Sequence, residues 1–484
     1  MNHLHRFCLL VAPLFAVVGV FVRGETIVKQ MHVITRHGSR YPLEKQADNL
    51  QENTPGSLTA YGQKQMFDLG MWVKETYNST GFFQVYVPWE VRLESSSFDR
   101  TLVSADSFAM GAFDYAARDP RGENLLPQLP PNIPVYSTDN EDDVYIRSYD
   151  KCPAFHDKLQ KLYSTQEWQD MEQKHLSLLQ RLGQLESFRN DADSSGKVPL
   201  TNLWNVFDSL HVAKTECTLS GEGLTLTCLS LPNPEDRFAL NDAEFEELEQ
   251  LTSSVEHLRY GPDQADRLLG GPLLLRIIDR MERHLSGNFF LYSAHYATIL
   301  GVLSALGESL ESTGTIPDYA SALIFLLQED TTTGQQHIQV VYKKDSRAST
   351  PPTVIPLGFC LNEVTCPAAT FATRWKGYSI AEWCRECGNR NAGVCLDYMV
   401  EEYEGENFGL DEPLVAGLLI GFGTSAALSL FCCFFCSTTK IKWDKRDGQE
   451  RPVKQSMAPE IENLDGSTSS LEVPSSQQKE PVMA

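Results

Sequence analysis

The chain has 484 residues, with 64 acidic and 41 basic side chains and a formal net charge of −23. This excess of negative charge excludes nucleic acid as a partner, because the phosphate backbone would be repelled. Hydrophobic residues make up 42% of the chain, which excludes disorder throughout. Twelve cysteines favour an oxidising compartment.

The first 24 residues have the pattern of a secretory signal peptide. A polar start with His3, His5 and Arg6 precedes the apolar run Phe7–Val22, which only Pro13 interrupts. An uncleaved membrane anchor is the alternative interpretation, but the run is short for a membrane span. We therefore expect cleavage after residue 24.

Residues 25–119 and 264–346 are predicted to form an α/β catalytic core. The alternation of β-branched strands, loops and helices is typical of a mostly parallel sheet flanked by helices. The first half contains, in order, a strand, a helix, a strand and a helix at Thr26–Ile34, Leu58–Thr76, Val85–Leu93 and Thr101–Ala117. The second half contains a helix, a strand and a pair of adjacent strands at Gly271–Leu285, Phe289–Ser293, Ala322–Leu327 and His337–Tyr342.

Between these halves, residues 120–263 are predicted to form an inserted helical cap. Several prolines come first, and three charged, amphipathic stretches follow at Ala154–Arg189, Leu200–Lys214 and Asn241–Leu258. Beyond Ser346, prolines and cysteines punctuate the chain, and residues 347–412 are predicted to be a cysteine-rich loop region.

Leu414–Cys436 is an uncharged run of 23 residues, long enough for a transmembrane helix. Acidic residues precede this run and basic residues follow it, so its C-terminal end is predicted to be cytoplasmic. A buried core helix is the alternative. The prediction is a single-pass type I membrane protein of the cell surface or of the endosomal or lysosomal membrane. Residues 25–412 would be extracellular or luminal, and the polar residues 437–484 would form a disordered tail.

The segment Arg36-His37-Gly38-Ser39-Arg40-Tyr41-Pro42 follows the first predicted strand. Two guanidinium groups four residues apart can hold one tetrahedral anion through charge-assisted bonds. The imidazole between them is suited to attack a bound phosphoryl group. A surface turn rich in Arg and His is the alternative, but Arg100 and His295 follow two other predicted strands. Since parallel strands end at one edge of a sheet, a phosphate site is predicted there.

These segments resemble the histidine phosphatases of the acid phosphatase and phytase branch, whose hallmark is Arg-His-Gly-x-Arg-x-Pro. The resemblance extends over about residues 28–345 and is closest to lysosomal, prostatic and membrane-bound acid phosphatases. It includes Gly56-Ser57-Leu58-Thr59 with Gly62, Gln65, Leu69 and Gly70, then Phe98-Asp99-Arg100-Thr101, and Leu291-Tyr292-Ser293-Ala294-His295. The resemblance implies a histidine-phosphatase (phosphoglycerate mutase-like) α/β core with a helical cap.

The resemblance also implies roles for individual residues. His37 would be the nucleophile and form a phosphohistidine, which water then hydrolyses. Arg36, Arg40, Arg100 and His295 would hold the phosphate oxygens and stabilise the transition state. No metal or other cofactor is implied. The expected substrates are small phosphomonoesters or a phosphoprotein, the expected lipid contact is one helix, and a homodimer is left open.

The chain departs from the family's motifs at the acid that protonates the leaving alcohol. The family has His-Asp where this chain has His295-Tyr296, and a phenol with a pKa near ~10 is a poor acid at low pH. Loss of general acid catalysis typically costs ~10²–10⁴-fold. A cap carboxylate could substitute, or substrates with good leaving groups could be preferred. Alternatively, the chain could be a catalytically weakened receptor or binding protein. Ser39 also replaces an Asp that the family often carries.

Residues 25–412 contain an even number of cysteines, which predicts disulfides rather than a zinc or redox site at Cys384 and Cys387. They are Cys152, Cys217, Cys228, Cys360, Cys366, Cys384, Cys387 and Cys395. Their number alone leaves the pairing open. The resemblance implies the pair Cys360–Cys366 and a bridge from Cys152 to the region of Cys384, which leaves Cys217–Cys228 and Cys387–Cys395. Asn78 begins the only N-glycosylation sequon.

Overall fold

A computed structural model describes residues 25–43, 55–84, 86–113, 133–218, 236, 239–282, 288–308, 314–361 and 363–397. The predicted signal peptide, the predicted span 414–436 and the predicted tail lie outside these residues. Among the described residues, no helix combines the length and the apolar character needed to cross a membrane.

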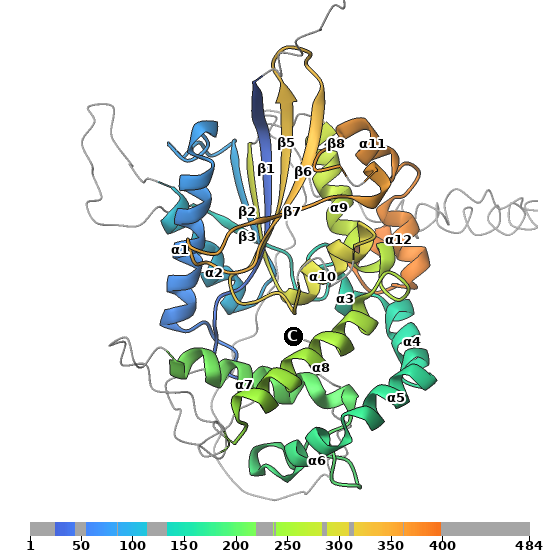
Figure 1. Ribbon diagram of the computed structural model, residues 1–484. Helices are drawn as coiled ribbons and strands as arrows, with labels where there is room; N and C mark the ends of the chain where they lie inside the picture. The colour runs from blue at the N-terminus through green and yellow to red at the C-terminus, as the bar shows by residue number, and fades with distance from the viewer. Residues whose placement is uncertain are drawn as a thin grey trace, which may run out of the picture. The chain divides into compact units, whose positions relative to one another are not determined.

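A central mixed sheet organises the described residues (Figure 1). Its strand order is β3-β2-β4-β1-β5-β6-β7, and β8 pairs with β6. The strands β3, β2, β4 and β1 are parallel neighbours, whereas β5 to β8 are joined by antiparallel pairs. The bounds are β1 Thr26–Arg36, β2 Val91–Ser95, β3 Val135–Ser137, β4 Phe289–Ala294, β5 Ala322–Asp330, β6 Gln336–Lys343, β7 Thr353–Ile355 and β8 Cys366–Pro367.

Helices cover both faces of this sheet, because β1 is apolar on both of its faces. Met31 and Val33 pack into one cluster with residues of α1 (Ala60–Thr76) and α2 (Asp99–Ala112). Ile34 points the other way, into a cluster with α9 (Asp266–Glu282), α10 (Tyr296–Ala305) and α11 (Ala368–Thr373). The predicted α/β class, a sheet flanked by helices, is confirmed.

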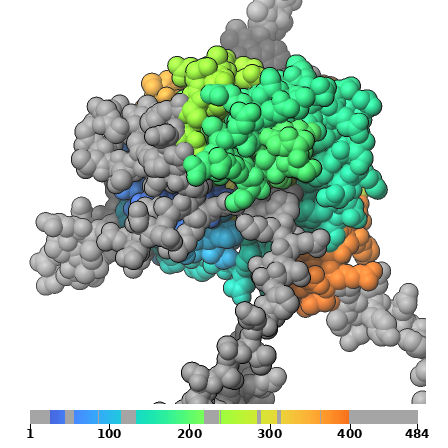
Figure 2. Space-filling model, turned by 90° about the horizontal axis from the view of Figure 1, so that it is seen from below, coloured from blue at the N-terminus to red at the C-terminus, as the bar shows by residue number. Residues whose placement is uncertain are grey.

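A helical segment lies at one end of the sheet (Figures 1 and 2). It comprises α3 Ser148–Lys151, α4 Pro153–Leu162, α5 Gln166–Lys174, α6 Leu176–Gln184, α7 Leu203–Thr218 and α8 Asp242–Tyr260. We call α3–α8 the cap. Asn241 and Glu244 form a reciprocal capping box at the start of α8. Apolar cap residues such as Trp204 and Val255 share one cluster with Tyr296 and Leu300 of α10, so the cap packs on the core.

Three predictions differ in the structure. The predicted cap, residues 120–263, includes β3 (Val135–Ser137), which pairs with β2, so this part of the range belongs to the sheet. The expected strand Val85–Leu93 begins only at Val91, because Pro88 lies in the preceding turn and has no backbone N–H for a sheet ladder. The region after Ser346 is not loop throughout: β7, β8 and α11 lie there, together with α12 (Ile380–Cys387).

Three disulfides lie among the described residues. Cys360–Cys366 confirms one prediction, but the implied pair Cys387–Cys395 is wrong. Cys152 bonds to Cys387, and Cys384 bonds to Cys395. Cys384 and Cys387 lie one helical turn apart on α12, and each has its partner's Cα within 5.5 Å. The bridge from Cys152 ties the cap to the C-terminal region, as expected. The predicted pair Cys217–Cys228 lies outside the described side chains.

Candidate active site

The ends of three parallel strands bring the predicted site residues together. Arg36 of β1 pairs with Ala294 of β4, so His37 and His295 are the next residues on adjacent strands. Their ring centroids are 5.6 Å apart and nearly perpendicular. Arg100 lies in the first turn of α2, which follows β2 on the other side of β4.

His37 is oriented by its own loop. Its Nδ1 lies 2.8 Å from the carbonyl oxygen of Gly38, which can only accept, so Nδ1 carries the proton. In the neutral ring, Nε2 therefore holds the lone pair. Burial lowers the pKa of His37 well below its ordinary value, and the charges of Arg100, Arg40 and Arg36 lower it further. The lowered pKa favours the uncharged ring in mildly acidic solution.

The loop that carries His37 is clamped against α1. A Cβ at Gly38 would lie 2.1 Å from the carbonyl oxygen of Gly62, so only glycine fits this approach. The backbone N–H of Ser39 donates to Gln65 Oε1 at 2.7 Å, and that of Gly38 donates to Ser104 Oγ at 3.2 Å. These contacts explain why Gly62 and Gln65 accompany the first motif.

Three guanidinium groups surround the imidazoles, and each is at most 6% exposed. Each also has a buried Nε without a partner among the described residues. Arg36 donates through Nη1 to the carbonyl oxygen of Pro317 at 2.7 Å and lies 4.0 Å from the centroid of the Tyr319 ring. Burial, followed by the charges of Arg40 and Arg147, lowers the pKa of Arg100 to about 9. Unmatched buried positive charge favours the binding of an anion here.

Arg40 is held by the cap. Its Nη2 donates to Oδ1 and Oδ2 of Asp208 at 2.9 and 3.0 Å, and Nη1 donates to the carbonyl oxygen of Tyr41 at 3.1 Å. Burial opposes the charge of Arg40, but Asp208 outweighs it, so the pKa of Arg40 is raised. Asp208 lies on α7, and nothing in the sequence identified it as a member of the site.

His295 is held by a chain of hydroxyl groups. Its Nε2 lies 2.9 Å from Ser96 Oγ, which lies 2.8 Å from Thr101 Oγ1. Its Nδ1 is buried and has no partner among the described residues. Burial lowers the pKa of His295 well below its ordinary value, and Arg100 and Arg147 add to the effect. Nδ1 is therefore the ring nitrogen of His295 that could contact a bound phosphate.

Arg147, directly before α3, is a fourth buried guanidinium that the sequence did not identify. It lies 4.3 Å from the centroid of the Phe98 ring, and Arg100 lies at the same distance from that ring. Arg147 also forms an ion pair with Asp150. It belongs to none of the motifs identified in the sequence, and the segment before α3 brings it to the site.

Tyr296, at the position where the resemblance leads us to expect an acid, points into the cap. Its ring stacks on Trp204 with centroids 4.1 Å apart, and its hydroxyl donates to Glu256 Oε2 at 3.2 Å. Glu256 also accepts from Arg259 Nη1 at 2.8 Å. Burial raises the pKa of Tyr296 well above its ordinary value, and the charge of Glu256 raises it further. The phenol is therefore neutral, and its hydroxyl proton is used in the hydrogen bond to Glu256.

Ser39 is also in contact with a carboxylate of the cap. Ser39 Oγ donates to Glu216 of α7, and Thr59 Oγ1 donates to the same oxygen at 2.8 Å. Burial raises the pKa of Glu216. At both positions where the resemblance leads us to expect Asp, a glutamate from the cap contacts the side chain that is present, Tyr296 or Ser39.

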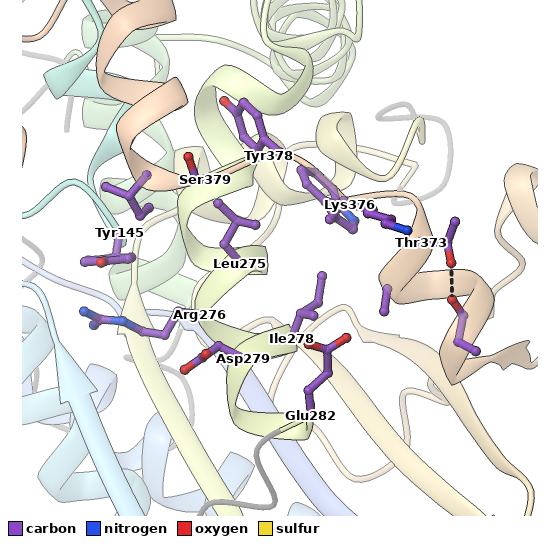
Figure 3. Close-up of a pocket in the computed structure, with 14 residues that line it drawn as sticks. Tyr145, Leu275, Arg276, Ile278, Asp279, Glu282, Thr373, Lys376, Tyr378 and Ser379 are labelled. Carbon is purple, nitrogen blue, oxygen red and sulfur yellow. Dashed lines mark hydrogen bonds between the residues drawn. The ribbon is translucent and has the colours of Figure 1, made fainter. Parts of the chain in front are cut away.

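Two further features lie outside this cluster. Asn78 is exposed at the end of α1, and its glycosylation stays a prediction. A pocket of about 780 Å³ lies between α9 and the segment of α11 and α12 (Figure 3). Its described lining includes none of the predicted site residues; it includes Tyr145, Leu275, Arg276, Ile278, Asp279, Glu282, Thr373, Lys376, Tyr378 and Ser379.

Residues 27–343 match the family described as histidine phosphatase superfamily (branch 2), and the chain belongs to that family. Prostatic acid phosphatase of Bos taurus is 26% identical over 385 residues, which cover 76% of this chain and 90% of the relative. Lysosomal acid phosphatase of Rattus norvegicus is 27% identical over 370 residues, covering 73% and 79%. The phytase of Klebsiella sp. ASR1 shares the fold, with a TM-score of 0.54, 16% identity and coverage of 72% and 95%.

Proposed function

We propose that the chain is an acid phosphatase that hydrolyses phosphomonoesters through a phosphohistidine on His37. The observation that carries this proposal is the tautomer of His37, whose unprotonated Nε2 lies among three buried arginines. A neutral imidazole attacks a phosphoryl group, and fixed positive charge stabilises the transition state.

The phosphate would be held before attack by Arg36, Arg40, Arg100 and Nδ1 of His295. The free Nε–H groups of the arginines supply donors that need no reorganisation. His37 Nε2 then forms a bond to phosphorus, and the ester P–O bond breaks with its electron pair on the leaving oxygen. In the second half, water attacks phosphorus, the P–N bond breaks, and inorganic phosphate leaves.

The same proposal includes the setting of the enzyme. Residues 414–436 would anchor residues 25–412 on the luminal or outer side of the cell-surface, endosomal or lysosomal membrane. The uncharged run supports the anchor, and three disulfides support an oxidising compartment. Relatives named lysosomal acid phosphatase support a lysosomal setting.

A second candidate function rests on Tyr296. Because this phenol cannot donate its proton, the chain could be a weakened phosphatase that serves as a phosphate-binding receptor. The two functions separate in an assay of the full chain in detergent with p-nitrophenyl phosphate and an alkyl phosphate. We expect turnover that His37→Ala abolishes. The enzymatic proposal fails if the wild-type protein turns over neither substrate.

A further inference from the structure

The leaving oxygen of an alkyl phosphate requires a proton that Tyr296 does not supply. Carboxylic acids are the usual donors in acidic solution. Three carboxylates of the cap reach the edge of the sheet where the motifs meet: Asp208, Glu216 and Glu256. Their contacts decide which of them can take part in the reaction.

Two of the three contact groups other than the phosphate-binding arginines. Glu256 is fully buried, and its two oxygens accept from Arg259 and from Tyr296, neither of which is a phosphate-binding group in the proposed function. Glu216 accepts from the hydroxyls of Ser39 and Thr59. Its charge acts on Tyr41 and Tyr61.

Asp208 faces the arginines themselves. Its carboxylate contacts Arg40 at 2.9 Å, and its charge also acts on Arg100 and on Tyr319. The Tyr319 ring lies 5.8 Å from that of His37. The carboxylate of Asp208 is thus beside the groups that surround His37, and α7 brings it from the cap, whereas His37 comes from the core.

Two other carboxylates near the site are placed differently. Asp318 accepts from its neighbour's backbone N–H and forms a pair with His211 at 3.3 Å. Burial alone would raise the pKa of Asp318, but the pairing with His211 lowers it, so this group stays ionised. Asp143 is buried beside Arg147 and accepts from the backbone N–H of Ile146 at 2.9 Å.

We propose that Asp208 is the catalytic general acid that protonates the leaving alcohol. The inference rests on the proposed function. In an in-line displacement the leaving oxygen departs opposite the nucleophile. With His37 on the core side, the leaving oxygen faces the cap, which supplies Asp208.

Protons and electron pairs balance in both halves of the reaction, the formation and the hydrolysis of the phosphohistidine. A monoanionic phosphate bound to Arg40 brings a proton, which passes to the neighbouring carboxylate of Asp208. When the P–O bond breaks, the carboxyl proton passes to the leaving oxygen and the alcohol departs. Asp208 then takes a proton from the attacking water, and the electron pair of the P–N bond returns to His37.

The test compares two substrates within one variant. Asp208→Asn keeps an oxygen that accepts from Arg40 but has no acidic proton. We expect its kcat/KM for an alkyl phosphate to fall by ~10²–10⁴-fold, with a much smaller loss for p-nitrophenyl phosphate, whose leaving group needs little protonation. The ratio of the two values does not depend on the folded fraction. Glu244→Gln, whose carboxylate pairs with Arg181 at 2.7 Å on the cap, should leave this ratio unchanged.

Two results would overturn the inference. An equal loss for both substrates in Asp208→Asn would show that Asp208 only positions Arg40. If Glu256→Gln or Asp143→Asn lost activity selectively toward the alkyl substrate and Asp208→Asn did not, the substituted Glu256 or Asp143 would be the proton donor. Failure of the proposed function has a different signature, because the wild-type protein would then turn over neither substrate.

Discussion

The contact between Gly38 and Gly62 permits a sharp test of the catalytic loop. In Gly38→Ala, the new Cβ would lie 2.1 Å from the carbonyl oxygen of Gly62 and 2.6 Å from its carbonyl carbon. Real Cβ contacts are longer than 3.0 Å, so the loop and α1 must separate by roughly 1 Å. Both partners are backbone, and no side chain can rotate away to relieve the overlap.

Because His37 directly precedes Gly38, the separation displaces the proposed nucleophile from the arginines. A misplacement of about 1 Å typically costs about 10²-fold in rate. We expect kcat/KM for p-nitrophenyl phosphate to fall by about that factor. Thermal unfolding, followed by circular dichroism, would establish that the variant is folded. Gly393→Ala is the matched control, since its nearest neighbour would be Asp142 Oδ1 at 3.4 Å, an ordinary contact.

A Gly38→Ala enzyme that retains the wild-type kcat/KM within twofold, at an unchanged melting temperature, would refute this reasoning. It would mean that the loop can move off α1 without disturbing His37.

Two further predictions concern protonation. The pKa of His37 lies well below 6.5, so kcat/KM for p-nitrophenyl phosphate should not decline as the pH falls through 6.5; a decline with a midpoint near 6.5 would contradict the assigned state of the ring. Tyr296→Phe removes the bond to Glu256 and leaves a buried oxygen unsatisfied, which should cost about 1–3 kcal/mol in a urea unfolding experiment. The ratio of alkyl to aryl turnover should not change, and a selective loss of alkyl turnover would identify Tyr296 as the acid.

The core of the site was predictable because its geometry follows from local structure. Arg36, His37 and His295 lie at or directly after strand ends, and Arg100 lies at the start of the helix after a strand. Once the strands are parallel, their C-terminal ends must meet at one edge. The sequence pattern therefore indicated both the residues and their convergence.

The contribution of the cap was not predictable in the same way. The spacing of apolar residues indicates which face of α7 or α8 is buried, but not which core residue that face meets. Asp208 contacts Arg40 across 168 positions of sequence, and Tyr296 contacts Glu256 across 40. The predicted pair Cys387–Cys395 was wrong for a related reason. Cys384 and Cys387 lie one turn apart on α12, and the sequence does not show which of them lies beside Cys152.

The register between β1 and β4 fixes the distance between the backbones of His37 and His295, which no side-chain rotation can change. Pairing of Arg36 with Ala294 leaves the two histidines one strand apart, about 4.8 Å at the backbone. Inserting one residue into either strand would shift one histidine by roughly 3.3 Å and turn it to the opposite face of the sheet. The pairing of the two strands therefore sets the spacing of His37 and His295. The cap, which carries Asp208 and Glu256, can change in length and sequence without altering that spacing, so the proposed leaving-group chemistry and the geometry of the proposed nucleophile can evolve separately.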